Sequence, residues 1–251
     1  MVHFSVPLLC LVTVASGSFP SWPSPTSTTT LAKTVSVKAD TPYDGKLVRF
    51  NAAFGDGGQD EGQAPLFELE DGATIKNVVI GPKAADGIHC KGSCTIENCW
   101  WEDVGEDAAT FRGTTSAKYT VSGGGAQKAD DKVFQHNGFG TVTITNFQAT
   151  DIGKLYRSCG NCVENGKDRH VVIDTVKLSG TTKVIAGVNG NYGDTAILKN
   201  IQIAGTVKVV CENYKGISDN DEEPKGVASY TTTQDGDGKI CIYKKSDIVS
   251  A

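Results

Sequence analysis

Two features that would have suggested a membrane or nucleic-acid protein are missing from this sequence of 251 residues. No stretch beyond the first 17 residues approaches the roughly 20 apolar residues that a transmembrane helix needs, so no membrane span is expected. The chain also lacks an excess of positive charge, because its net charge is −5. Proteins that bind polyanions are usually basic overall, so nucleic acid is not an expected partner. Any acidic ligand must therefore be held locally, by a cluster of cations or by a bound metal ion.

The N-terminus has the features of a secretory signal. It reads MVHFSVPLLCLVTVASGSFP, in which an apolar run over residues 6–14 is followed by three small residues. The run is too short to cross a membrane, and it predicts a signal peptide over residues 1–17. We therefore expect a secreted, extracellular protein.

The rest of the chain divides into a short segment and one large domain. Residues 18–33 are rich in Ser, Thr and Pro and show no periodicity, which predicts a flexible lead-in. Residues 34–251 are enough for a single domain. We expect this domain to act as a monomer.

Cysteine usage is consistent with an oxidising compartment. Of the eight cysteines, Cys10 lies in the predicted signal peptide and seven remain. An odd number leaves at least one as a free thiol or an intermolecular partner. A metal site is the weaker interpretation, because the C-x2-C at 159–162 has no second such pair. We expect the region after Tyr214 to cap the domain, with Cys211 paired to Cys241.

Helical periodicity is scarce from residue 34 onward, and short β-branched runs broken by Gly, Asn and Asp dominate, which are strand and turn signals. Six runs align: TIKNV at 74–78, TIENC at 95–99, TVSGG at 120–124, TITNF at 143–147, VIDTV at 172–176 and ILKNI at 197–201. Their fourth positions are spaced by 21, 25, 23, 29 and 25 residues, and they are Asn77, Asn98, Gly123, Asn146, Thr175 and Asn200.

A repeat of this length predicts a solenoid. Leucine-rich repeats have a similar period, but their Leu framework is missing here. The pattern favours an all-β protein, a single-stranded right-handed parallel β-helix (β-solenoid), in which each coil buries its apolar face against its neighbours and Asn residues stack at one corner. Gly and Asn suit such corners because these need left-handed backbone. We expect the second position of each run to point inward: Ile75, Ile96, Val121, Ile144, Ile173 and Leu198.

The segment GEDAATFR at 105–112 places two carboxylates side by side. Neighbouring side chains of a regular strand point to opposite faces, so Glu106 and Asp107 can serve one site only if the chain bends. Taken alone, such a pair is more often a solvated turn. In a solenoid, however, residues one period apart lie on the same wall. Asp86 precedes Glu106 by 20 residues, and Lys132 follows Asp107 by 25.

Further cations continue this series. Lys154 lies 22 residues beyond Lys132, and Arg157 follows three positions later. The sequence therefore predicts a wall with acidic residues on the first coils and basic residues on the next. Such a groove suits a polymer with repeated carboxylates.

Three converging carboxylates would repel one another unless a cation lies among them. Oxygen ligands from Asp86, Glu106 and Asp107 favour Ca2+ over zinc. His89 lies close in the sequence, but a lone histidine in a strand is more often structural. We therefore predict a calcium site.

Beside a cation, a base can remove the proton alpha to a substrate carboxylate, because the developing charge is stabilised. The base must be neutral when it acts. Arg is essentially always charged, whereas Lys loses its proton more readily when other cations crowd it. Lys132 is thus the first choice for the base and Arg157 the second. Lys154 and Arg157 are expected to bind and stabilise the substrate, and Arg112 to hold a second carboxylate.

At this point the residues carry a resemblance to a known family. The run APLFELEDGATIKNVVIGPKAADGIHCKGSCTIENCWWEDVGEDAATFR, followed by KADDKVFQHNGFGTVTITNF and DIGKLYR, resembles the small pectate lyases of polysaccharide lyase family 3. It closely resembles the secreted fungal and oomycete-type members. The resemblance covers residues 34 to about 215, and the loop SCGNCVENGKD and the acidic segment SDNDEEPKG depart from it.

The resemblance implies a parallel β-helix and calcium-dependent β-elimination of polygalacturonate, the pectate polymer of plant cell-wall pectin. It implies calcium ligands at Asp86, Glu106 and Asp107. It also implies catalytic or substrate-binding roles for the three cations, Lys132, Lys154 and Arg157. Glu61, in DEGQAPLF, matches a further acidic position that contacts metal or substrate.

Two other functions stay open at this point. A polygalacturonase-like hydrolase on the same fold would need Asp residues as acid and base and would not need the basic groove. A non-catalytic carbohydrate-binding β-solenoid would have its charges scattered around the coils.

Overall fold

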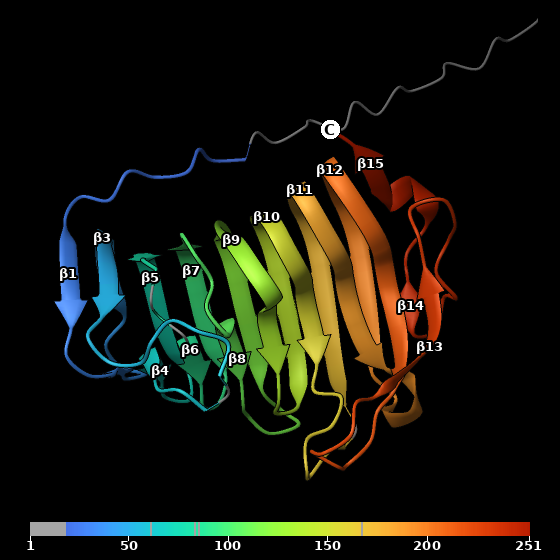
Figure 1. Ribbon diagram of the computed structural model, residues 1–251, viewed down its shortest axis with the longest axis horizontal. Helices are drawn as coiled ribbons and strands as arrows, with labels where there is room; N and C mark the ends of the chain where they lie inside the picture. The colour runs from blue at the N-terminus through green and yellow to red at the C-terminus, as the bar shows by residue number, and fades with distance from the viewer. Residues whose placement is uncertain (1–18, 61, 83, 85, 167) are drawn as a thin grey trace, which may run out of the picture.

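The computed structural model describes residues 19–251 except 61, 83, 85 and 167, so the predicted signal peptide lies outside the described residues. Its strands stack into one elongated parallel β-helix (Figure 1). The strands are β1 (Thr28–Leu31), β2 (Val35–Val37), β3 (Tyr43–Ala52), β4 (Pro65–Leu69), β5 (Ala73–Ile80), β6 (Asp86–Cys90), β7 (Cys94–Trp101), β8 (Asp107–Phe111), β9 (Lys118–His136), β10 (Gly140–Ser158), β11 (Arg169–Asn189), β12 (Thr195–Lys215), β13 (Lys225–Tyr230), β14 (Cys241–Ile242) and β15 (Ile248–Ser250). Two short 3-10 helices complete the described secondary structure, η1 (Gly190–Tyr192) and η2 (Lys245–Asp247).

The predicted all-β parallel solenoid is confirmed. One path of hydrogen-bonded strands runs β1-β3-β5-β7-β9-β10-β11-β12, and every pairing along it is parallel. A second path, β2-β4-β6-β8, joins the second half of β9. Early coils therefore consist of two short strands separated by a loop, whereas the coils from β9 onward are continuous strands that serve both paths. In the part of the chain that is described, no helix has the length and apolar character to cross a membrane.

The interior contains a ladder of aliphatic side chains in register. Ile75 pairs with Ile96, which pairs with Val121, and the same row continues on β10 to β12. The side chains predicted to point inward are all fully buried: Ile75, Ile96, Val121, Ile144, Ile173 and Leu198. Each coil thus covers the apolar side chain of the coil before it, which confirms the prediction made from the repeat.

The fourth repeat positions form a corner of the β-helix. All six residues have positive φ, between 50° and 70°, namely Asn77, Asn98, Gly123, Asn146, Thr175 and Asn200. Asn tolerates this left-handed backbone better than most residues, and its amide also links coils. The Nδ2 of Asn98 donates to the Oδ1 of Asn77 over 2.8 Å, and Asn77 donates in turn to Asp44 over 3.0 Å.

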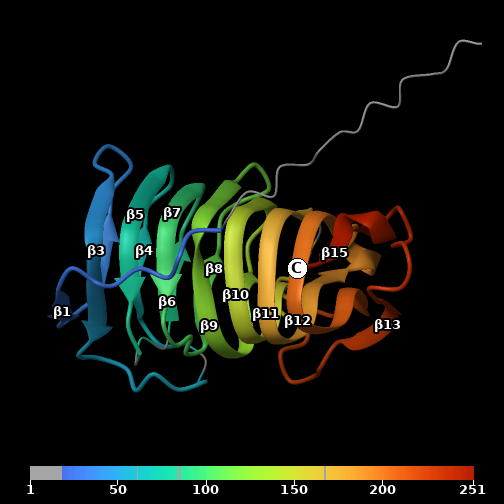
Figure 2. The ribbon, with the colours of Figure 1, turned by 90° about the horizontal axis from the view of Figure 1, so that it is seen from above.

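The N-terminal segment differs from the expected irregular lead-in. Residues 28–31 form β1 and pair with β3, so the β-helix begins before residue 34. Upstream, Trp22 packs edge-on against Trp100 with ring centroids 4.8 Å apart, and Gln148 donates to the carbonyl of Pro20 over 2.7 Å. The segment consequently follows the outside of the coils toward β1 (Figure 2).

The C-terminal region covers the last full coil, as expected. β13 pairs antiparallel with β12, and β14 and β15 pair parallel with it. The predicted disulfide between Cys211 and Cys241 is present. Two others connect residues close in sequence, Cys90–Cys94 and Cys159–Cys162. Cys99 is the one cysteine of the described chain outside a disulfide, and it is buried.

Candidate metal and substrate site

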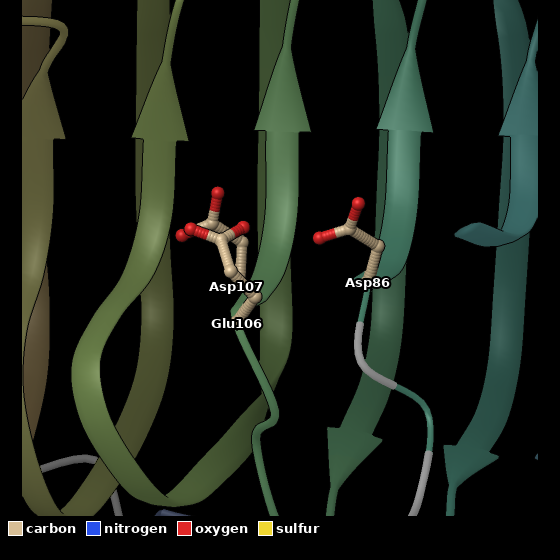
Figure 3. Close-up of side chains that lie close together, drawn as sticks. All are labelled: Asp86, Glu106 and Asp107. Carbon is tan, nitrogen blue, oxygen red and sulfur yellow. The ribbon is translucent and has the colours of Figure 1, made fainter. Parts of the chain in front are cut away.

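The two adjacent carboxylates share one site because the chain bends at Glu106. Glu106 lies in a bend, and β8 begins only at Asp107. Both side chains can therefore turn to the same side, where Asp86 of β6 approaches them (Figure 3). One carboxylate oxygen from each of the three residues lies within 4.8 Å of the others. The three side chains predicted as metal ligands are thus brought together, and all are buried.

Strand register places the acidic and basic residues in one row. Asp86 pairs with Asp107, Asp107 with Lys132, and Lys132 with Lys154, across β6, β8, β9 and β10. The stacking predicted from near-period spacings is therefore present in the fold. The Nζ of Lys132 lies 3.0 Å from the Oε1 of Glu106 and 3.8 Å from the Oδ1 of Asp107.

The acidic cluster has the properties of a cation site. The Oδ1 atoms of Asp86 and Asp107 are buried and have no hydrogen-bond donor among the described residues. Burial, assisted by the charges of Glu106 and Asp86, raises the pKa of Asp107 well above its ordinary value, although Lys132 acts in the opposite direction. Buried carboxylate oxygens without a hydrogen-bond donor are costly, and a hard cation with oxygen ligands would stabilise them. The residues present fit Ca2+.

His89 connects this cluster to Arg112. Its Nε2 lies 3.2 Å from the Oδ2 of Asp86 and 3.4 Å from the Nη2 of Arg112. Arg112 itself is exposed just beyond β8 and lies outside the row of Asp107 and Lys132. Arg112 and Phe139 line a cavity of about 540 Å3, and Cys162 of the Cys159–Cys162 disulfide lines the same cavity. Glu61, which the resemblance matches to a further contact with metal or substrate, lies outside the described residues.

Asp131 is a site residue that the sequence analysis missed. Its Oδ2 lies 2.7 Å from the Nζ of Lys132, and its Oδ1 accepts a hydrogen bond from Lys154. Although burial opposes the shift, the two ammonium groups lower the pKa of Asp131 to about 2. The sequence signal was present, because Asp131 precedes Lys132 directly, as Glu106 precedes Asp107. A shift of strand register between β9 and β10 lies beside it.

The charges around Lys132 differ from those predicted. Burial alone would lower the pKa of Lys132, but the carboxylates of Asp107, Asp131 and Glu106 outweigh it and raise this pKa above its ordinary value. The expectation that crowding by cations lowers the pKa of Lys132 is therefore wrong for the protein's own side chains. The Oε1 of Glu106 lies 3.0 Å and the Oδ2 of Asp131 lies 2.7 Å from the Lys132 Nζ.

Arg157 lies three positions after Lys154 on β10. It pairs with Gln135 on one side and Gly187 on the other. The side chain is buried, and its Nη1 donates to the Oδ1 of Asn189 over 3.0 Å. Burial lowers the pKa of Arg157 from its ordinary value, and the charges and dipoles around it oppose this shift. Asn189 gave no sequence signal, because it lies 32 residues from Arg157, outside the repeat spacing.

Comparison with known proteins agrees with this geometry. The chain matches the family model for pectate lyase over residues 20–221. Pectate lyase H of Emericella nidulans is 45% identical over 223 residues, covering 88% of this chain and 82% of that protein. Probable pectate lyase E of Neosartorya fischeri is 44% identical over 227 residues, covering 90% and 85%. The chain belongs to the pectate lyase family, and it is a lyase.

Solved structures show the same architecture. The catalytic domain of pectate lyase PelI from Erwinia chrysanthemi superposes with a TM-score of 0.71 at 33% identity, covering 90% of this chain and 98% of that one. A second structure of PelI, in complex with tetragalacturonic acid, has a TM-score of 0.73 at 33% identity and covers 88% and 70%. The parallel β-helix is thus the fold of these solved pectate lyases as well.

Proposed function

We propose that this protein is a secreted, calcium-dependent pectate lyase that cleaves polygalacturonate by β-elimination. The observation that carries the proposal is the single row of Asp86, Asp107, Lys132 and Lys154 across four neighbouring strands. A polymer with a carboxylate on every sugar needs both a cation site and basic side chains along its path. Three disulfides support secretion, because disulfides form and persist in oxidising compartments.

In this proposal Asp86, Glu106 and Asp107 hold the Ca2+, with Glu61 as a further predicted contact to metal or substrate. When bound there, the ion supplies electrostatic stabilisation to a substrate carboxylate. Lys154 and Arg157 bind and orient the uronate, because they follow the acidic cluster along the same wall. Arg112, which is exposed, contacts a second carboxylate of the polymer.

Lys132 is the proposed base. It takes the proton from the ring carbon that bears the carboxylate, a carbon–carbon double bond forms, and the glycosidic oxygen leaves with the next sugar. The neutral form is required, so the fraction of active enzyme grows with pH over the alkaline range. Arg157 is the second candidate, because burial lowers the pKa of its guanidinium while carboxylates raise the pKa of the Lys132 ammonium group. Lys132 is preferred for its position, since its Nζ lies 3.0 Å from Glu106 of the acidic cluster.

The single row of charges also argues against the two other functions. A non-catalytic solenoid gives no reason for buried carboxylates beside a buried lysine. A hydrolase would use a pair of carboxyl groups as acid and base, whereas each carboxylate of this cluster faces either the others or Lys132.

The test is to incubate purified protein with polygalacturonate and Ca2+ and to record ultraviolet absorbance and fragment masses. A lyase yields absorbing, unsaturated fragments whose mass is one water lower than that of hydrolysis products. Saturated fragments without absorbance would show a hydrolase instead. Bound but uncleaved polymer would show a carbohydrate-binding protein.

A further inference from the structure

The side chain of Arg157 extends across the neighbouring coil rather than straight out of its own strand. Arg157, Gly187 and Glu212 are register partners on β10, β11 and β12. A Cβ atom on Gly187 would lie 2.9 Å from the Cδ of Arg157 and 3.1 Å from the Cε2 of Tyr214. Gly187 therefore leaves the space in which the arginine side chain and the tyrosine ring meet.

The guanidinium of Arg157, at the end of this side chain, is enclosed by neighbouring residues. Its carbon lies 3.9 Å from the centroid of the Tyr214 ring, which is the geometry of a cation–π contact. The Nη1 donates to Asn189, and the Nη2 lies so close to Gly160 that no Cβ would fit there. Only 6% of Arg157 is exposed. The side chain is consequently held in one rotamer before any ligand arrives.

Asn189 and Tyr214, the two partners of the Arg157 guanidinium, are themselves held by hydrogen bonds. The Oδ2 of Asp194 accepts from the backbone N–H and the Nδ2 of Asn189, each over 3.1 Å. The same Nδ2 donates to the carbonyl of Cys159 over 2.9 Å. Because the amide nitrogen is committed to these acceptors, the amide oxygen must face Arg157. The Oη of Tyr214 donates to Glu212 over 2.8 Å, which holds the ring.

We propose that Tyr214 and Asn189 are positioning residues, which hold the Arg157 guanidinium preset for a carboxylate of the polymer. This inference rests on the proposed function, in which Arg157 binds the substrate. A free arginine side chain loses rotamer freedom when it grips a carboxylate, and a preset one has lost that freedom already. The arrangement should therefore act on substrate affinity more than on the chemical step.

The experiment compares Tyr214→Leu with Tyr214→Phe in the full chain, using polygalacturonate and Ca2+. Tyr214→Leu removes the ring, and we expect KM to rise roughly tenfold with kcat changed less than about threefold, a coupling typical of residues in contact. Tyr214→Phe keeps the ring and loses only the hydrogen bond to Glu212, so its KM should rise by about threefold at most, well below the rise for Tyr214→Leu. Tyr230→Leu is the matched control, because Tyr230 lies on β13, which pairs with the strand of Tyr214, and its hydroxyl donates to Asp237.

The same substitution in an Arg157→Ala background separates positioning from a structural role. If Tyr214 acts through Arg157, Tyr214→Leu should raise KM no further in that background. An equal rise in both backgrounds, or a wild-type KM with only a lower Tm, would overturn the inference. So would an Arg157→Ala enzyme with a wild-type KM.

A chemical measurement keeps the inference testable without turnover. Phenylglyoxal modifies exposed guanidinium groups, and peptide mass analysis reports the labelling rate of Arg157. Tyr214→Leu should accelerate this labelling severalfold, whereas an unchanged rate would show that the ring does not hold the side chain. If wild-type protein makes no unsaturated product, the proposed function fails. The dissociation constant for tetragalacturonate then replaces KM in the same comparison.

Discussion

His136 makes the stability of this protein depend on pH in a way that can be calculated. It is fully buried at the end of β9, where its ring packs between Tyr119 and Tyr156 and its Nδ1 lies 2.8 Å from the Tyr156 hydroxyl. Burial lowers the pKa of His136 to about 3, from an ordinary value of 6.5. The folded protein therefore keeps this imidazole neutral at pH values where the unfolded chain binds a proton.

The direction and size of the effect follow from this difference. Between pH 6.5 and about 3 the unfolded state binds one more proton, so stability is highest above pH 6.5 and is lost as the pH falls. One bound proton changes the free energy of unfolding by about 1.4 kcal/mol per pH unit. Acidification from pH 7 to pH 5 should therefore remove about 2 kcal/mol through His136.

The assay is urea unfolding of wild type and His136→Gln at both pH values. Glutamine can retain a hydrogen bond to Tyr156 but does not titrate. On acidification the free energy of unfolding of His136→Gln should therefore fall by about 2 kcal/mol less than that of wild type. His170→Gln is the control, because that ring is only half-buried. An equal fall in the free energy of unfolding of wild type and His136→Gln between the two pH values would refute the reasoning, whatever the absolute stability of each protein.

Other consequences of the fold and the site can be measured in the same way. Ile144→Ala opens a cavity in the buried ladder and should lower the free energy of unfolding by about 2–4 kcal/mol in urea, whereas a loss near zero would contradict the inward stack. Lys132→Ala should lower kcat by several orders of magnitude while circular dichroism and Ca2+ binding stay as in wild type. A folded Lys132→Ala enzyme with more than about a tenth of the wild-type kcat, a barrier change under about 1.4 kcal/mol, would move the base to Arg157. Arg157→Lys should raise KM, because lysine lacks the planar two-point grip on a carboxylate, and an unchanged KM would exclude that contact.

The repeat made much of the fold predictable, because a coil of the β-helix returns the chain to the same corner after each period. Asn77 and Asn98 mark that corner twice with the residue type that its backbone favours, and Ile75 and Ile96 follow from them by position. The row of Asp86, Asp107 and Lys132 was accessible for the same reason. Spacing alone located these side chains on one wall.

Other contacts depend on distances that spacing does not contain. Tyr214 on β12 reaches Arg157 on β10 because only one coil, β11, lies between them and Gly187 leaves space on that coil. Trp22 packs on Trp100 although its segment has no strand pattern. The surroundings of Lys132 show the same limit. The repeat spacing identifies the residues on neighbouring coils, but it does not show which of their side chains lies closest to the Lys132 ammonium group. Such contacts follow from loop lengths and side-chain reach.

The central claim is that Asp86, Glu106 and Asp107 hold a calcium ion on which cleavage depends. The direct test is the initial rate of unsaturated product formation as a function of free Ca2+, for wild type and Asp107→Asn, with the exposed Asp44→Asn as control. We predict no product from chelator-treated wild type, full recovery on addition of Ca2+, and only partial recovery of Asp107→Asn at much higher Ca2+. Full activity of the chelator-treated enzyme, or a wild-type calcium response of Asp107→Asn, would contradict the account.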